Sequence, residues 1–565
     1  LPQAAAGIGS VLILHRLVRK WMGELAAHLA ALALAVTPVA ALMFRFNNPD
    51  GVLTFLLLAS AWALWAAIES GRTRHLVVSA VLMGFAFNTK MLQAFVVLPV
   101  FILVYLWAGP PKLGRRIVQL AYAAAALIVS AGWWVAIVAL WPAASRPYVG
   151  STNNNSILSL VFGYNGLSRI FGNGQGAPGG GAGPGGAGGP GGGGGFGGSP
   201  GWLRMFNNAV GGQISWLLPL AVAGLAAGIW LTRRNRRTDT GRAGWLLWGG
   251  WTLITLAVFS QAQGVFHQYY TVALAPGVAA LAGGGAVALW RLGRTQKWLG
   301  WALPAAIAVT AWWAVTLLHR TPTYVPWLRT AIVVGATLAV AGFVVAASYR
   351  HRLTVTVAAV VAGATLLAGP VAYTLTTVRN PAGGSLAAAG PSTISGPGGR
   401  GGPGEATTVD AGLISYLESH RNGAQYVVAA FGSQSSASVI IATGQPVITI
   451  GGFNGGDPAP TLAQFQKLVA DGKVRYILLS DQGGPGGGGF PGGGFTPPAG
   501  FAPPGGNGLP GGNGFPGGGP GGPGGGGPNG SGTSQAIRTW VTEHGTQVAA
   551  SEYGGTGTST LYALS

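Results

Sequence analysis

A succession of apolar segments, each close to the length of a bilayer crossing, constrains the fold of this chain more than any other feature. About 20 apolar residues cross a bilayer as one helix. By this measure the sequence predicts twelve spans, at 2–15, 25–44, 51–68, 75–89, 92–109, 118–141, 210–231, 244–260, 268–290, 298–318, 327–348 and 353–376. Charged residues make up only 8% of the chain, against roughly 25% in soluble domains. The sequence therefore predicts an all-α polytopic membrane domain and excludes a soluble globular enzyme.

Basic residues separate these segments in a regular way. The chain carries 32 Lys and Arg against 12 Asp and Glu, a formal net charge of +20. Eighteen of the basic residues cluster in every second inter-helix loop, at 16–20, 72–74, 112–116, 233–242, 291–297 and 350–352. Such alternation marks the cytoplasmic loops of membrane proteins. It therefore indicates membrane topology and argues against nucleic acid as a partner.

With the basic loops inside, both ends of the chain are expected on the outer face of the membrane. The first residue is Leu1, and no basic signal-peptide region precedes the first apolar segment. We therefore expect the sequence to be N-terminally truncated, with at least one earlier span missing.

Glycine is concentrated in two tracts. Residues 171–200 and 481–530 together hold 44 of the 99 glycines, and this composition predicts flexible, disordered segments. The predicted organisation is a membrane domain at 1–380 with a Gly-rich loop insertion at 171–200, a Gly/Pro linker at 381–405, and an extracytoplasmic domain at 406–565 with a Gly-rich insertion at 482–532.

The predicted C-terminal domain alternates between helical and strand patterns. Helices are expected at 408–420, 433–443, 462–470 and 534–543, and strands at 426–431, 447–450, 474–480, 547–550 and 559–562. This alternation predicts a small α/β domain. Its run of glycines at 451–456 lacks the Lys-Ser/Thr of a phosphate loop, which favours a turn over a nucleotide site. We expect the domain to bind an acceptor or to act as a structural lid.

Acidic residues are rare in the predicted membrane domain, which contains four. Three lie beside basic residues in inner loops, where a solvated surface charge is the favoured interpretation: Glu24, Glu69 and Asp239. Asp50 is predicted on the outer face. Pro49 suits the first helical position and Asn48 the N-cap, which places Asp50 in the first turn, where the helix dipole favours its ionised form. The pattern fits a polar site and, equally, a helix start stabilised by an acid.

Further polar residues fall on the same predicted face. Lys90, in Asn88-Thr89-Lys90-Met91, lies where a span ends, and it either snorkels to the interface or contacts a phosphate. His267, Tyr269 and Tyr270 lie at the outer end of the ninth span, where Tyr often belongs to an aromatic belt. The loop 142–209 is long enough to be functional or disordered, and it carries Arg146, Tyr148, Asn153–Asn155, Arg169 and Arg204.

These residues resemble those of a known family. The sequence is similar to integral-membrane glycosyltransferases of the GT-C class, in particular family 39, which contains protein O-mannosyltransferases and the aminoarabinose transferase of lipid A. It looks most like bacterial mannosyltransferases with a glycine-rich insertion and a C-terminal extracytoplasmic domain. The resemblance rests on four segments in order: Arg45-Phe46-Asn47-Asn48-Pro49-Asp50, Asn88–Met91, His267-Gln268-Tyr269-Tyr270 and Ile450–Thr461.

The resemblance implies transfer of a sugar, mannose being the family-level expectation, from a polyprenyl-phosphate donor to a protein, lipid or glycan acceptor. The reaction would occur on the outer face of the cell membrane, with inversion at the anomeric carbon. Carried onto this chain, Asp50 is a secondary catalytic acid. The resemblance assigns substrate contacts to Arg45, Asn47, Asn48, Lys90, His267, Tyr269 and Tyr270, with Arg45 and Lys90 at the phosphate.

Two expectations follow from where the sequence departs from the family. The family's principal catalytic acid lies in the first outward loop, before a Lys-Pro-Pro segment, and Leu1 falls after that point; this fragment is therefore expected to lack it. A divalent metal stays open as a cofactor, but the chain has no Cys and its His residues show no metal-ligand spacing. Two other classes also stay open, a multi-span transporter and a non-enzymatic envelope scaffold.

Overall fold

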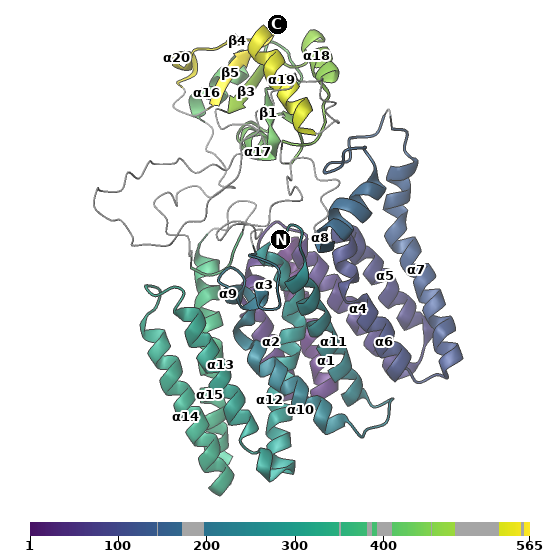
Figure 1. Ribbon diagram of the computed structural model, residues 1–565, viewed down its shortest axis with the longest axis vertical. Helices are drawn as coiled ribbons and strands as arrows, with labels where there is room; N and C mark the ends of the chain where they lie inside the picture. The colour runs from purple at the N-terminus through teal and green to yellow at the C-terminus, as the bar shows by residue number, and fades with distance from the viewer. Residues whose placement is uncertain are drawn as a thin grey trace, which may run out of the picture. The chain divides into compact units, whose positions relative to one another are not determined.

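The structure is a computed structural model that describes residues 1–143, 145–171, 197–349, 352–380, 387–391, 410–453, 455–480, 530–554 and 559–565. These residues form two compact units, one before residue 407 and one after it (Figure 1). Most of the predicted glycine-rich insertions at 171–200 and 482–532, and most of the predicted linker at 381–405, lie outside the described residues. The predicted disorder of the tracts and the domain boundaries therefore stay predictions.

The first unit is helical throughout. Its elements are α1 (Pro2–Met22), α2 (Glu24–Ala35), α3 (Pro38–Met43), α4 (Asp50–Ser70), α5 (Thr73–Lys90), η1 (Met91–Val96), α6 (Leu98–Ala108), α7 (Leu113–Leu140), η2 (Ser159–Leu167), α8 (Ser168–Phe171), η3 (Arg204–Phe206), α9 (Gly211–Ile214), η4 (Ser215–Leu217), α10 (Leu218–Thr232), α11 (Thr240–Gln261), η5 (Gln268–Leu274), α12 (Ala275–Thr295), η6 (Lys297–Leu299), α13 (Ala302–Leu318), α14 (Trp327–Tyr349) and α15 (Arg352–Arg379).

Nine helices in the described ranges are long and apolar enough to cross a membrane. The prediction of an all-α membrane domain is thus confirmed, whereas the count of twelve spans is not. The three expected spans that fall short have local causes. The segment 2–15 is the apolar part of α1, which continues through Arg16, Arg19 and Lys20. The segment 25–44 breaks before Pro38, and 92–109 begins as the 3₁₀ turn η1.

A row of glycines in α12 brings three other helices close to it. A Cβ on Gly285 would lie 2.6 Å from Gly224 Cα in α10, and a Cβ on Gly283 would lie 2.6 Å from backbone atoms of α2. Between them, Gly284 faces Trp21 of α1. Small residues permit this close approach of helices. This close packing sets the position of α12, and therefore also the position of the segment that begins at residue 268 and leads into α12.

Two serines hold the antiparallel helices α4 and α5 in register. Ser60 Oγ donates to the Ser79 carbonyl at 2.8 Å, and Ser79 Oγ donates to the Ser60 carbonyl at 2.9 Å. Asp50 lies ten residues before Ser60, and Lys90 eleven residues after Ser79. At 1.5 Å per residue these offsets are about 15 and 16 Å along the two helices. The register therefore brings Asp50 and Lys90 to the same level.

The second unit is a small α/β domain, as predicted. Its elements are α16 (Ala411–Ser419), β1 (Ala429–Phe431), α17 (Gly432–Thr443), β2 (Ile448–Ile450), α18 (Leu462–Ala470), β3 (Tyr476–Ser480), α19 (Gly530–His544), β4 (Thr546–Gln547), α20 (Ala550–Tyr553) and β5 (Ser559–Ala563). The sheet order is β2-β1-β3-β5-β4. Strands β1, β2 and β3 are parallel, and β5 is antiparallel to both β3 and β4.

Apolar residues cover both faces of this sheet, as a mostly parallel sheet requires. On one face Leu478 packs with residues of α16, α17 and α20, and on the other Ile477 and Leu479 pack with residues of α18 and α19. One predicted strand, 547–550, is wrong beyond Gln547. Residues from Ala550 form the helical turn α20, which ends at Gly554 with a φ of 67°.

Candidate functional site

Asp50 lies at the start of α4 in the local structure that the sequence predicts. Pro49 already has helical dihedral angles, and the Asn48 side chain accepts a hydrogen bond from the Asp50 N–H at 2.9 Å, as an N-cap does. The Asp50 side chain is fully buried. Its Oδ1 atom has no hydrogen-bond partner within the described part of the chain. A buried carboxylate oxygen without a partner is costly, so it is a candidate for contact with a substrate.

Lys90 makes an ion pair with this carboxylate. Its Nζ lies 2.5 Å from Asp50 Oδ2, and 20% of the lysine side chain is exposed. Lys90 is the last residue of α5, and Met91, which follows, has a φ of 49°. A non-glycine residue in this left-handed region is strained, and such strain clusters at functional sites. The abrupt end of α5 leaves the lysine partly accessible beside a buried acid.

The aromatic residues before α12 surround Lys90. Its Nζ lies 3.9 Å from the centre of the Tyr270 ring and 5.3 Å from that of Tyr269. The rings of His267 and Tyr269 are stacked, with centroids 5.1 Å apart. Tyr269 is also hydrogen-bonded to the side chain of Asn48. The structure thus brings together six of the eight residues predicted for the site: Asn48, Asp50, Lys90, His267, Tyr269 and Tyr270.

Arg169 is a second cation beside Tyr270, and it is not among the residues predicted for the site. Its Nη1 donates to the Tyr270 hydroxyl and to the Val265 carbonyl, each at 3.1 Å. Backbone hydrogen bonds from Gln263 and Gly264 to the carbonyls of Ile170 and Arg169 hold the two segments together. Arg169 and Tyr270 are 101 residues apart. The only sequence signal was an arginine in a long loop on the predicted outer face.

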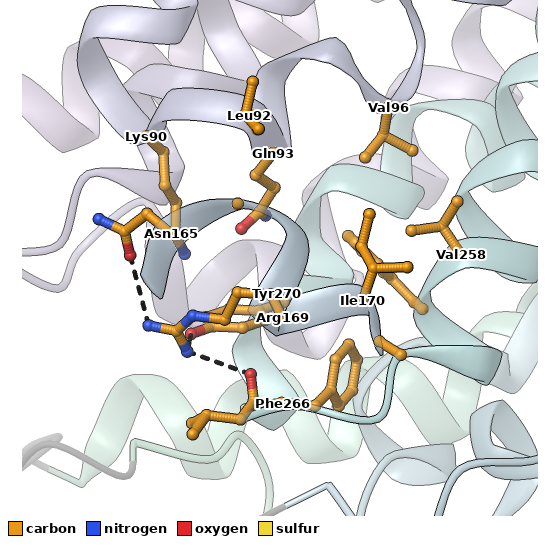
Figure 2. Close-up of a pocket in the computed structure, with 14 residues that line it drawn as sticks. Lys90, Leu92, Gln93, Val96, Asn165, Arg169, Ile170, Val258, Phe266 and Tyr270 are labelled. Carbon is orange, nitrogen blue, oxygen red and sulfur yellow. Dashed lines mark hydrogen bonds between the residues drawn. The ribbon is translucent and has the colours of Figure 1, made fainter. Parts of the chain in front are cut away.

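A pocket opens beside these cations. Lys90 and Gln93 reach into it from the α5–η1 segment, while Asn165 and Tyr270 flank Arg169 (Figure 2). Gln93 Nε2 is buried and has no hydrogen-bond partner among the residues described. Besides Gly166, the rest of the lining is apolar: Leu92, Val96, Ile170, Val258, Phe259, Ala262, Val265 and Phe266. The pocket therefore joins a cationic, polar end to an apolar slot.

Among the described residues, the charged groups at this end of the pocket are two cations and one carboxylate. Lys90 pairs with Asp50, and Arg169 contacts Tyr270. His267 adds no charge at neutral pH, because burial, followed by the charges of Arg169 and Lys90, lowers the pKa of His267 to about 4. A site with this balance suits an anionic group such as a phosphate.

The two remaining predicted residues lie in the segment before α4 and have other partners. Arg45 is exposed, and its Nη1 donates to the Thr377 carbonyl of α15 at 2.5 Å. Asn47 is exposed, and its Oδ1 accepts from Gln3 Nε2 at 3.3 Å. Their predicted roles in substrate binding stay predictions.

Metal-ligating side chains converge elsewhere. Over the described residues, the group that could hold a metal ion is His15, Glu24 and His28. Near the pocket, Asp50 already pairs with Lys90. The described residues thus supply no three-ligand set at the pocket, and a metal there stays an untested expectation.

Family models match both units of the chain. Residues 1–135 match the model described as "Dolichyl-phosphate-mannose-protein mannosyltransferase". Residues 413–492 match the one described as "Putative mannosyltransferase YkcB-like, C-terminal".

Two curated proteins of Bacillus subtilis are similar along most of their length. The protein named "Putative mannosyltransferase YkcB" is 37% identical over 86% of this chain and 78% of its own. The protein named "Putative mannosyltransferase YycA" is 36% identical over 85% of this chain and 80% of its own. Among solved structures, ArnT from Cupriavidus metallidurans bound to undecaprenyl phosphate aligns with 85% of this chain and 78% of its own, with 19% identity and a TM-score of 0.45.

The relatives and family models agree with one another and with the apolar helices of the first unit. This is a multi-pass membrane protein. The identity to YkcB over more than two thirds of its length, together with the two matching models, shows that the chain belongs to the GT-C glycosyltransferases, in the family of YkcB-like mannosyltransferases.

Proposed function

We propose that this protein transfers a mannosyl unit from a polyprenyl-phosphate donor to an acceptor hydroxyl on the outer face of the membrane. The observation that carries the proposal is the convergence of Lys90 and Arg169 on Tyr270, at the polar end of an apolar pocket, beside the buried carboxylate of Asp50. A lipid-linked sugar phosphate has the matching parts: an apolar chain, an anionic phosphate and a sugar.

The donor class is supported by the chemistry of the pocket and by the relatives. Lys90 and Arg169 leave an excess positive charge for the phosphate, and the eight apolar lining residues suit the first units of a polyprenyl chain. The family model that matches the first helices names a dolichyl-phosphate-mannose enzyme. Mannose as the transferred sugar is supported by the names of the relatives.

The proposed reaction is a single displacement at the anomeric carbon. The acceptor oxygen forms a bond to that carbon as the bond from the carbon to the phosphate oxygen breaks, and the electron pair leaves with the lipid phosphate. Lys90 and Arg169, with the Gln93 amide, stabilise the charge that develops on this phosphate. The carboxylate of Asp50 accepts the hydrogen bond of the acceptor hydroxyl at Oδ1 and helps to remove its proton as a general base, in a role secondary to that of the principal catalytic residue.

The outer face is supported by the distribution of charge along the helices. α4 begins at Asp50 and ends at Ser70, and the basic pair Arg72 and Arg74 follows directly. Basic loops are typical of the cytoplasmic side. The candidate site lies at the opposite end of α4, and therefore on the side proposed to be extracytoplasmic.

The test is release of polyprenyl phosphate from a radiolabelled polyprenyl-phosphate mannose by the full-length protein in proteoliposomes. We expect Asp50→Asn to lower the rate of release by about 10²-fold or more, the size of a general acid–base contribution. The exposed Asp471→Asn in the C-terminal domain serves as the matched control and should keep the wild-type rate. Normal release by Asp50→Asn would disprove the role given to Asp50. Absence of release by the wild type, with uptake of a solute instead, would disprove the transferase proposal.

A further inference from the structure

Two imidazoles and a carboxylate meet near the turn between α1 and α2, in a place that the proposed reaction does not use. A ligand atom from each of His15, Glu24 and His28 lies within 4.8 Å of the others. The two imidazole rings meet edge to face, with centroids 4.8 Å apart. His15 is half-buried, and the other two side chains are exposed. The three groups are near enough for small side-chain rotations to place them around one ion.

The backbone explains why these side chains converge. Glu24 and His28 are four residues apart on α2 and so lie on the same face of that helix. His15 comes from α1, which turns into α2 through Gly23, with a φ of 91°. The spacing of His residues along the chain does not indicate this group, because one of the three side chains belongs to a different helix. They come together only in the tertiary structure.

A hydrogen bond prepares one of the imidazoles for a metal. His28 Nδ1 lies 2.9 Å from the Glu24 carbonyl oxygen. A carbonyl can only accept, so Nδ1 carries the proton of a neutral imidazole, and the lone pair is then on Nε2. Metal-binding histidines characteristically donate their other N–H to a carbonyl or a carboxylate in this way.

The existing partner of Glu24 is weak. Arg19 Nε lies 3.8 Å from Glu24 Oε2, and both side chains are more than half exposed, at 57% and 58%. Such surface ion pairs contribute little to stability. Displacement of Arg19 from the Glu24 carboxylate by a divalent cation therefore costs little free energy.

We propose that His15, Glu24 and His28 form a site for a divalent transition metal, Zn²⁺ above all, with solvent completing the coordination. Two imidazole nitrogens and one carboxylate oxygen are ligands that Zn²⁺ prefers, whereas Ca²⁺ and Mg²⁺ take oxygen ligands. The site is separate from the candidate catalytic pocket. Gln3 of α1 contacts Asn47, three residues before Asp50, and His15 lies twelve residues further along α1, about 18 Å away along the helix. The metal clamps the α1–α2 hairpin and takes no part in the transfer reaction.

The experiment is a Zn²⁺ titration of the intact protein, purified in detergent with a tag that contains no histidine, against a competing chromogenic chelator. We expect one Zn²⁺ per chain. In His15→Ala and His28→Ala the affinity for Zn²⁺ should fall by at least about 10-fold. A loss of that size is typical even when only a residue hydrogen-bonded to a metal ligand is replaced. The matched control is His319→Ala. His319 is also exposed, and its Nδ1 makes the same type of bond to a carbonyl four residues earlier, at 2.8 Å, but it lies outside the cluster.

A second measurement separates loss of binding from misfolding. Zn²⁺ should raise the melting temperature of the wild type and of His319→Ala, because a ligand that binds only the folded state stabilises it. It should leave His28→Ala unchanged. Glu24→Gln, which preserves the size of the side chain, should weaken binding as well. Failure of the wild type to bind stoichiometric Zn²⁺, or an equal loss of affinity in His319→Ala, would overturn the proposal.

Discussion

Lys90 has two kinds of partner at the candidate site, the carboxylate of Asp50 and the ring face of Tyr270. Tyr270 in turn accepts a hydrogen bond from Arg169. One aromatic residue therefore fixes the spacing of two cations that would otherwise repel each other. Its ring and its hydroxyl serve different cations, so a single substitution can separate the two roles.

The substitution Tyr270→Phe keeps the ring 3.9 Å from Lys90 Nζ and removes the hydroxyl that Arg169 contacts. A hydrogen bond to a charged group contributes about 1.5–3 kcal/mol. If Arg169 binds the donor phosphate, KM for the donor should rise by about 10-fold or more, with a smaller change in kcat. Steady-state kinetics with the lipid-linked donor measure both constants. The matched control is Tyr122→Phe on α7, whose side chain is 62% exposed, and an equal rise there would contradict the assignment.

The lowered pKa of His267 predicts how the stability of the folded protein depends on pH. Its pKa is lowered to about 4 in the folded protein, first by burial and then by Arg169 and Lys90, whereas an unfolded histidine titrates near 6.5. Between these two pH values the unfolded state binds more protons than the folded state. His267 therefore does not reduce the free energy of unfolding above pH 6.5, and it reduces that free energy progressively as the pH decreases toward 4. The melting temperature of His267→Gln should depend less on pH between 7 and 4.5 than that of the wild type. The exposed His420→Gln should retain the wild-type dependence.

At the scale of elements, the site depends on how α11 ends before the segment 262–270. Arg204 is 3% exposed, and its guanidinium donates to the carbonyls of Phe259, Ala262 and Gly198. The carbonyls at a helix C-terminus lack partners within the helix, and a cation there satisfies them. Arg204 thus anchors the segment that leads to Tyr270.

Replacing Arg204 by Met keeps much of the apolar stem and removes all four of these hydrogen bonds. We expect a loss of about 2–3 kcal/mol, because buried carbonyls lose a charged partner. A lower melting temperature in detergent would report it. Arg233→Met, at an exposed position in a basic loop, is the control and should change the melting temperature little. Equal melting temperatures for the two variants would show that Arg204 does not anchor the segment.

The elements also show where sequence patterns are reliable. The start of α4 was predictable because Asn48, Pro49 and Asp50 act within one turn of the backbone. The helices and most strands of the C-terminal domain were predictable because their apolar patterns repeat over a few neighbouring residues. The strand predicted at 547–550 failed because Ala550 begins a helical turn that closes at Gly554. Short apolar segments do not distinguish a turn of helix from a strand.

At the scale of the whole molecule, the distribution of basic loops predicts which side of the membrane each part faces. The chain has no Cys, so single cysteines can report accessibility directly. We expect Ser415→Cys, exposed in α16, to react with a membrane-impermeant maleimide in intact cells, and Asn235→Cys, in a basic loop, to react only after permeabilisation. The reverse result would place the C-terminal domain in the cytoplasm and remove the outer-face part of the proposed function.

The sequence by itself determined the class of this protein and most of its local structure. Apolar length, basic loops and capping residues act over a few neighbouring residues or through the bilayer, and helical hydrogen bonds are local, so these features can be read along the chain. Only the tertiary structure decided which side chains meet. Asp50 meets Lys90 because two serines set the register of α4 and α5. Arg169 meets Tyr270 across 101 residues because backbone hydrogen bonds join their segments. Such contacts depend on how the helices pack, and the spacing of residues along the chain does not indicate which distant side chains will meet.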